Sequence, residues 1–517
     1  MNIRKLFALS MSVVAGLTCM GGCGGGKENK DALLISVFDG GYGTKWATDI
    51  AAAFEEKTGI QTEVKPSTYV DGFRTALESG TTEADLFFGK KAHWDLFYKE
   101  VKVGSQKFKP IFADLTDIYT SVIPGEDKTI REKLSPDVAD LLNFGTEEEP
   151  LYYTYSWAIG DMGIVVNNKE WADSWVYPNT TDELLALCET VKAAGKIPFV
   201  YSLDYSYWDG YYQYWCSQYE GSENMARYWA GYDKSGKRYQ PELVNLQGAL
   251  EGLKVLQALL DKDKGYQHAA SKSINFTQAQ NYLLAGHAVM QPNGDWLETE
   301  MQGNYDPDEV DISLKKIPVV SALGTRLGIT DKELSAIVSY VDGNGELPSF
   351  TSSAGYTGEE VVAAVREARN MFISSANSHI AYVPVYSNKI NEAKQFLQFM
   401  SSDEGIELYS NATLGAGLPF EYDYLGNDRI QMSAFMQTSH EMMAGGSHYM
   451  DNMKDRLRAL GGVYFINHEN YLGVSRVFSS DKSSSSYLTA DQLFMLNYTY
   501  MRERWDTIFL TNAGLKN

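Results

Sequence analysis

The sequence predicts an α/β fold built on doubly wound sheets, and two observations lead to this prediction. Short apolar runs of strand length alternate with segments of helical periodicity from residue 33 onward, and the same alternation starts again after Asn143. Strands that alternate with helices are typical of parallel sheets, whose ligands bind at the carboxyl ends of the strands. The length of 517 residues fits about two to four domains.

The first series of elements is identified by apolar spacing and by glycine stops. The spacing places Trp46, Ile50 and Phe54 on one face of a helix that ends at Gly59. The elements expected around this helix are a strand at 33–38, a glycine-rich turn at 39–43, a strand at 61–65, a helix at 70–78 and a strand at 84–88.

The second series follows Asn143. Residues 152–166 are apolar and long enough for two strands, and Thr180 with Glu183 predicts a capping box for a helix that ends near Gly195. The further elements expected are a strand at 197–201 and helices at 242–260, 276–284, 358–372, 388–400 and 490–505.

The N-terminus predicts export from the cytoplasm. Arg4 and Lys5 precede an apolar run at 6–18, which is too short for a permanent transmembrane helix. A basic start followed by such a run is typical of a secretory signal, so we expect a signal peptide at 1–22.

The residues that follow this run predict a lipid anchor. Residues 20–23 read MGGC and resemble the lipobox of bacterial lipoproteins, so we expect lipidation of Cys23 and a flexible tether at 23–31. Cys19 is the rival site, and an ordinary secreted protein is the alternative. More than one acyl chain would give stable attachment to the membrane.

Charge and composition narrow the possible partners. The formal net charge of −22 disfavours nucleic acid and anionic lipid head groups. The chain has 34 Tyr and 10 Trp, many of them in polar segments, where aromatic rings are candidates for contact surfaces. Cys188 and Cys216 form either one disulfide or two buried free thiols, and the sequence leaves both open.

The most informative stretch is 286–296 (GHAVMQPNGDW). A short apolar strand ends there in a turn that presents Asn293, Asp295 and Trp296 together. The C–H faces of a sugar stack on an indole ring, while its hydroxyl groups bond to carboxylate and amide groups. The alternative is that Trp296 covers a core and Asp295 caps a helix at 295–301.

Segments spread over most of the chain carry a resemblance to one protein family. These segments are 46–60, 84–88 (ADLFF), 163–170 (GIVVNNKE), 178–184 (PNTTDEL), 284–296 and 388–405. In this order behind the lipobox, they resemble the extracellular solute-binding proteins of carbohydrate uptake, the family of the maltodextrin-binding protein. The chain departs from the family pattern where Ala84 replaces Pro, where Asn167 replaces Tyr, and at 178–184, which lacks a Trp.

The resemblance spans about residues 33–424. A long insert at 315–375 looks like that of the larger Gram-positive members of the family. The tail from Tyr464 onward matches no motif of the family.

The resemblance implies a two-lobed fold of the type II periplasmic-binding-protein kind. The implied boundaries are 32–155 and 380–413 for lobe one, 156–379 and 414–517 for lobe two, and hinge crossings near 155–157, 378–384 and 411–417. An oligosaccharide would bind between the lobes and close them, and the closed form would meet ABC permease subunits. We expect a monomer outside the cytoplasm, attached to the membrane by its lipid only, with no cofactor, no metal and no catalytic activity.

The candidate ligand-binding residues lie in turns and strand ends that such a fold places near the cleft. They are Tyr42, Asp85, Lys90, Trp157, Tyr201, Asp204, Trp208, Asp295 and Trp296. The alternative for Tyr42 is a surface turn, for Asp85 a bond to the backbone or to a lysine, and for Trp157 a place in the core.

Two other functional classes remain open. A secreted lipoprotein glycoside hydrolase shares the export signal, and its carboxylate pair leaves no sequence signature. A surface adhesin or sensor would bind glycan without transport. Against an enzyme, the chain has no Gly-x-Ser-x-Gly, P-loop or Cys-x-x-Cys motif, and the His-Glu pairs at 440–441 and 468–469 lack the second histidine of a zinc helix.

Overall fold

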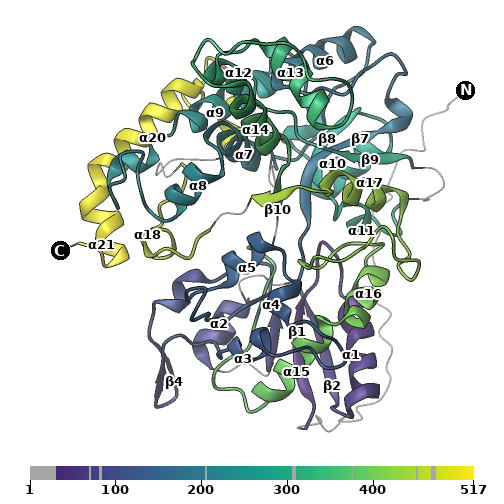
Figure 1. Ribbon diagram of the computed structural model, residues 1–517, viewed down its shortest axis with the longest axis vertical. Coiled ribbons are helices and arrows are strands. Elements are labelled where there is room, and N and C mark those ends of the chain that lie inside the picture. Colours follow the sequence, from purple (N-terminus) through teal and green to yellow (C-terminus); the bar gives the residue numbers. More distant parts are fainter. Residues whose placement is uncertain are drawn as a thin grey trace, which may run out of the picture.

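The computed structural model describes residues 31–68, 72–80, 84–203, 207–305, 310–374, 376–449, 452–466 and 473–516. These residues form two lobes, each built around its own sheet, with helices packed around both sheets (Figure 1). The expectation of a two-lobed α/β fold is confirmed.

The sheet of lobe one is mixed. β1 (Leu33–Phe38) pairs in parallel with β2 (Thr62–Ser67) and with β3 (Leu86–Phe88). β11 (Ile380–Tyr382) pairs antiparallel with β3 and with β6 (Tyr155–Ser156). The first three strands follow the predicted alternation with helices, whereas β6 leads into lobe two and β11 returns from it.

α1 (Lys45–Thr58) packs on this sheet through the apolar face that its sequence predicts. Trp46, Ile50 and Phe54 recur every fourth residue, and all three are fully buried. Gly59 ends the helix with a φ of 75°, and its N–H donates to a carbonyl in the last turn. The other elements of lobe one are α2 (Gly72–Ser79), η1 (Trp94–Phe97), β4 (Val101–Val103), β5 (Gln106–Phe108), α3 (Thr116–Thr120), α4 (Ile130–Lys133), α5 (Pro136–Leu142), α15 (Ile390–Met400) and α16 (Asp403–Ala412).

The sheet of lobe two is mostly antiparallel. β7 (Asp161–Asn167) pairs antiparallel with β8 (Met290–Gly294), β9 (Ile312–Lys315) and β10 (Met371–Ser374), and β12 (Ser447–Tyr449) pairs in parallel with β10. β8, β9 and β10 return alongside β7 in the opposite direction, although helices lie between β7 and β8 in the sequence. Among the strands that the structure describes, the parallel pairing expected from the alternation is found in β1–β2, β1–β3 and β10–β12.

Lobe two is the more helical lobe. Its other elements are η2 (Asn168–Glu170), α6 (Thr181–Ala193), α7 (Trp208–Glu220), α8 (Ser222–Trp229), η3 (Pro241–Val244), α9 (Gln247–Leu260), η4 (Ala269–Lys272), α10 (Phe276–Leu284), α11 (Leu297–Glu300), α12 (Ala322–Leu327), α13 (Asp331–Val341), α14 (Gly358–Arg369), α17 (Ala434–Met443), α18 (Arg456–Ala459), α19 (Val474–Phe478), α20 (Ala490–Arg504), η6 (Trp505–Phe509) and α21 (Leu510–Ala513). The predicted insert supplies α12, α13 and α14, and α20 of the tail packs on α9.

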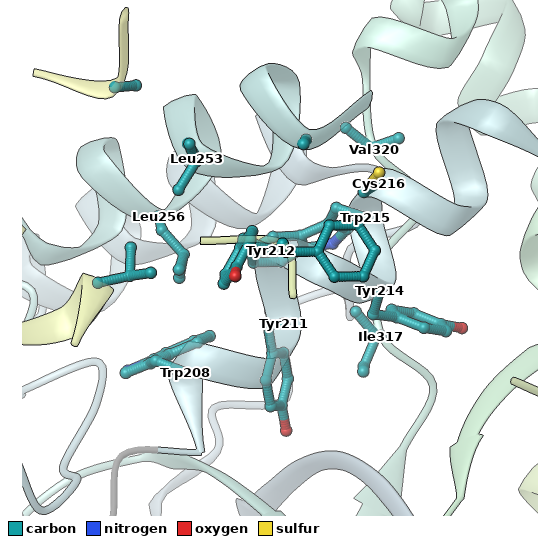
Figure 2. Close-up of a cluster of buried hydrophobic side chains, with 14 of the residues drawn as sticks. Trp208, Tyr211, Tyr212, Tyr214, Trp215, Cys216, Leu253, Leu256, Ile317 and Val320 are labelled. Atoms are coloured by element: carbon teal, nitrogen blue, oxygen red, sulfur yellow. The ribbon is translucent and has the colours of Figure 1, made fainter. Parts of the chain in front are cut away.

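α7 fills the core of lobe two with aromatic side chains. Trp208, Tyr211 and Trp215 are fully buried, and Figure 2 shows this cluster beside leucines of α9. The helix is enclosed by α9, α12, α14 and α19. Rings that the sequence suggested for contact surfaces are therefore core residues here, because neighbouring helices cover α7 on several sides.

Two local predictions change in the structure. The Thr180 side chain caps α6 by accepting from the Glu183 N–H, but the Glu183 carboxylate accepts from the Asn179 N–H, so half of the predicted capping box forms. The strand predicted at 197–201 is wrong, because only Phe199 makes β-bridges and the pairing is too short for a ladder.

The remaining sequence predictions concern thiols, membrane segments and the N-terminus. Cys188 and Cys216 are buried free thiols, so the disulfide alternative is wrong. In the described ranges, no helix is long and apolar enough to cross a membrane. Cys23 and the candidate ligand residue Asp204 lie outside the described residues.

Candidate ligand-binding cleft

A cavity of about 770 Å³ lies between the two lobes. Lobe one contributes α5 and Gly145, and lobe two contributes α8, Arg238, Met371 and the segment 452–455. Ligand pockets in proteins usually measure about 300–1,000 Å³, so the interlobe cavity has room for a small organic ligand.

α5 turns two carboxylates toward this cavity. Val138 and Leu142 are buried, whereas Asp137, Asp140 and the buried Leu141 line the cavity. The two aspartates are three residues apart, so they lie on the same side of the helix. Carboxylates only accept hydrogen bonds when ionised, which suits a ligand rich in hydroxyl donors.

α8 supplies the aromatic wall on the opposite side. Its buried face carries Met225 and Trp229, which both line the cavity. The Trp229 ring lies 5.6 Å from the Phe465 ring and 5.1 Å from the Arg458 guanidinium, measured to the ring centroids and to Cζ. These contacts hold the indole in place beside the cavity. Trp229 also lines a smaller cavity of about 210 Å³ within lobe two.

Three charged residues of the lining, Arg238, Lys454 and Asp455, are bonded to one another or to other protein groups. Arg238 forms an ion pair of 3.1 Å with Asp455, which also accepts from the Tyr239 hydroxyl at 2.9 Å. Lys454 Nζ donates to the carbonyl oxygens of Asp140 and Asn143, and burial lowers the pKa of Lys454 to about 8. The lining therefore combines fixed cationic and anionic groups and has no single dominant charge.

A second cavity of about 350 Å³ adjoins the first at the start of α5, since Pro136 and Asp137 line both. Its wall is formed by residues 418–425 and by α17, where the Tyr424 and His440 rings stack at 4.8 Å. Burial lowers the pKa of His440, so this ring is neutral near neutral pH. The cleft thus continues past the interlobe cavity.

Two of the predicted residues meet across the lobe boundary. The Tyr42 hydroxyl donates to Asp295 Oδ1 at 2.7 Å, and the two side chains are 2% and 1% exposed. Tyr42 follows β1 of lobe one, and Asp295 follows β8 of lobe two. Burial raises the pKa of Asp295 to about 7, and the neighbouring Asp161 carboxylate raises it further, while the bond from Tyr42 opposes the shift.

The predicted tryptophans are packed into the interior. Trp296 is 8% exposed, and its Nε1 donates to the Tyr207 hydroxyl at 3.2 Å. Trp157 is fully buried, stacks on Trp46 at 5.2 Å and donates to the Gly89 carbonyl at 2.9 Å. Trp208 belongs to the buried cluster of α7.

The other predicted residues that the structure describes are separate from the Tyr42–Asp295 contact and from the predicted tryptophans. Asp85 accepts from the Leu34 N–H and from the Ser387 hydroxyl, which is the backbone role named as its alternative. Tyr201 is buried, and this burial raises its pKa. Lys90 is exposed, with Nζ 5.4 Å from the Phe38 ring centroid.

The sequence-based selection missed the lining of the interlobe cavity. Asp137, Asp140, Trp229, Arg238 and Lys454 line it, whereas none of the predicted residues that the structure describes does so. Trp229 has the helical spacing of an ordinary core residue, and the charged residues look like solvated surface. The lining comes from four regions that are distant in the sequence, 136–145, 222–238, Met371 and 447–455, so no local pattern marks it.

The comparisons with known proteins identify the family. The model of the bacterial extracellular solute-binding protein family matches residues 40–407. The chain belongs to this family. Membership makes it an extracytoplasmic solute-binding protein, in a family described by binding rather than by catalysis. No curated protein matches its sequence.

Solved structures of similar fold span nearly the whole of this solute-binding protein. The apo form of RafE from Streptococcus pneumoniae has 13% identity and a TM-score of 0.56, and the match covers 91% of this chain and 98% of that chain. RafE in complex with raffinose has 13% identity and a TM-score of 0.55 over 91% of this chain and 100% of that one. A structure from work on xylan utilization by the thermophilic bacterium Caldanaerobius polysaccharolyticus has 12% identity and a TM-score of 0.57 over 92% and 99%. At this identity the likeness shows the fold.

Proposed function

We propose that this solute-binding protein binds an oligosaccharide between its lobes and delivers it to an ABC permease. The observation that carries the proposal is the interlobe cavity, whose lining combines the Trp229 indole with the carboxylates of Asp137 and Asp140. An aromatic face and carboxylates suit the C–H faces and the hydroxyl groups of a sugar. The similarity in fold to RafE, which was solved with raffinose, supports a sugar ligand.

The pair formed by Tyr42 and Asp295 has a place in this proposal. Opening of the lobes would separate the two side chains, because one belongs to each lobe. The Asp295 carboxylate would then be available to a sugar hydroxyl, with Trp296 beside it. These residues remain proposed ligand contacts of the open form, together with Lys90 at the surface of lobe one.

The anchor and the permease complete the proposed function. The apolar run at 6–18 followed by MGGC at 20–23 supports a lipidated Cys23 and a monomer attached to the outer face of the cell membrane. Delivery to ABC permease subunits rests on the resemblance to carbohydrate-uptake proteins.

Binding is tested by a thermal-shift screen of the chain from Lys27 onward, followed by calorimetry. The panel contains raffinose and xylo-oligosaccharides, with amino acids and peptides as the competing ligand class. We expect a sugar to bind and Trp229→Ala to weaken it. Trp175→Ala is the matched control, because Trp175 packs against Trp171 outside the cavity lining. A shift with amino acids or peptides alone would remove the sugar from the proposal.

The competing functions give different results with the same protein. Shortening of the oligosaccharide after overnight incubation, seen by chromatography, would identify a glycoside hydrolase. For an adhesin or sensor, sugar would bind, but deletion of the gene would leave uptake of that sugar unchanged.

A further inference from the structure

Residues 452–456 of lobe two extend across the cleft to lobe one. Met453 packs against the hydrophobic cores of both lobes. Asn452, Lys454 and Asp455 line the interlobe cavity together with α5 of lobe one. The family model ends at residue 407, so this segment lies outside the part of the chain that the family match covers.

The C-terminal half of this segment is attached to its own lobe. Asp455 caps α18 by accepting from the Leu457 N–H, and it also bonds to Arg238 and Tyr239. Arg456 Nε donates to the Ala513 carbonyl at 3.2 Å. These contacts hold the segment to lobe two whatever the position of lobe one.

The N-terminal half reaches the other lobe. Lys454 Nζ donates to the carbonyl oxygens of Asp140 at 2.6 Å and Asn143 at 2.7 Å, at the C-terminal end of α5. The carbonyls at a helix C-terminus lack partners within the helix and carry partial negative charge, so they favour a cation. The Lys454 ammonium also lies 5.6 Å from the Phe144 ring, and the Tyr98 hydroxyl donates to the Lys454 carbonyl.

Within the described part of the chain, Lys454 forms no ion pair with a carboxylate at 4 Å or less. Its ammonium is bound by carbonyl groups and an aromatic face of lobe one, and all of these contacts are lost when the lobes separate. The contact therefore depends on closure of the lobes, and its position in the cavity lining would place it beside a ligand bound in that cavity.

We propose that residues 452–456 form an interlobe strap, in which Lys454 holds the cleft closed over its ligand. The role of the strap in retaining a sugar rests on the proposed function. Its role in closing the lobes does not rest on that function, because the strap joins the lobes through protein atoms alone. A variant that weakens the strap opens the lobes more often, which lowers the apparent affinity in proportion to the closed fraction.

The test compares Lys454→Met with the parent protein. Methionine keeps an unbranched apolar side chain beside Phe144 but removes the ammonium. Loss of two charge-assisted hydrogen bonds should speed release of a bound oligosaccharide by about tenfold or more in stopped-flow fluorescence. Without ligand, small-angle scattering should show a larger radius of gyration. Lys482→Met is the matched control, since Lys482 lies on lobe two and pairs with Asp261 and Asp263.

The possible outcomes distinguish failure of the proposed strap from failure of the proposed sugar binding. Unchanged release and unchanged scattering in a folded Lys454→Met protein would overturn the strap. If the parent binds no sugar, the proposed function fails, and the scattering comparison still decides the strap. If Lys454→Met does not fold, Tyr98→Phe replaces it, because this variant removes only the hydroxyl that donates to the Lys454 carbonyl. It should shift scattering in the same direction, and no shift would overturn the proposal.

Discussion

Replacement of Asp295 by asparagine should remove most of the pH dependence of stability that this buried carboxyl causes. Asp295 is 1% exposed and has a pKa of about 7 instead of 3.8, first because it is buried and second because the Asp161 carboxylate is near. The other titratable groups beside Asp295 are Tyr42, which donates to it, and Tyr409, whose pKa is raised first by burial and then by the Asp295 carboxylate. Asparagine keeps an oxygen that accepts from the Tyr42 hydroxyl and carries no charge.

The sign follows from the two pKa values. Between about pH 4 and about pH 7 the folded protein binds the proton and the unfolded chain does not, so the free energy of unfolding falls as the pH rises through this window. A difference of about three pH units between the folded and unfolded pKa corresponds to about 4 kcal/mol. Above about pH 7 the carboxyl is ionised in both the folded and the unfolded state, so the free energy of unfolding falls no further. Asp295→Asn should therefore be more stable than the parent at about pH 8, by up to about 4 kcal/mol, and similar to it near pH 4.

The measurement is urea unfolding of both proteins at intervals from about pH 4.5 to about pH 8, followed by tryptophan fluorescence. Asp173→Asn, an exposed position on lobe two, is the control for loss of one negative charge. A stability difference between the parent and Asp295→Asn that stays constant over this range would refute the reasoning, since it would mean that the buried carboxyl titrates as it does in the unfolded chain.

Three further predictions test the cleft, the core and the anchor. Trp229→Ala should weaken oligosaccharide binding by about 1–3 kcal/mol, measured by calorimetry on the folded protein, because the indole is the aromatic residue of the interlobe cavity lining; since the ring is also 5% exposed and belongs to the core of lobe two, the free energy of unfolding should fall as well, and unchanged affinity would place the sugar elsewhere. Trp296→Ala should lower the free energy of unfolding by about 3–5 kcal/mol, because its ring is 8% exposed; normal stability together with a large loss of affinity would show instead that the ring stacks on the ligand. Cys23→Ser should release the protein from the membrane fraction, whereas Cys19→Ser should leave it attached, and the reverse result would assign the lipid to Cys19.

The elements that the sequence predicted best are those whose signals lie within a few residues of each other. α10 (Phe276–Leu284) has the predicted bounds, and Asn275 with Gln278 forms a capping box at its start. α1 ends at Gly59 as expected, since a left-handed residue there costs glycine nothing. The order of such segments was also enough to indicate the family, which the comparisons confirm.

The candidate site was harder to predict, and the aromatic residues show why. Trp157 and Trp208 have the local setting of contact residues, yet helices and strands from elsewhere in the chain cover them completely. Trp229 looks like a core residue of an amphipathic helix and is one, at 5% exposure, yet it also lines the cavity. Burial is a property of the surfaces that meet around a side chain, so hydrophobicity and spacing within one segment do not determine it.

By itself, the sequence determined the first strands and several of the longer helices, among them α1, α6, α9, α10, α14, α15 and α20, because apolar spacing and caps within one or two turns set these features. The order of its segments indicated the solute-binding family. Only the tertiary structure decided the antiparallel pairing of β7, the contact between Tyr42 and Asp295 across 253 residues, and the cavity between α5, α8 and the interlobe strap. These features arise when surfaces that are remote in the chain come together. Which surfaces meet depends on the free energy of packing of the whole chain, to which every segment contributes.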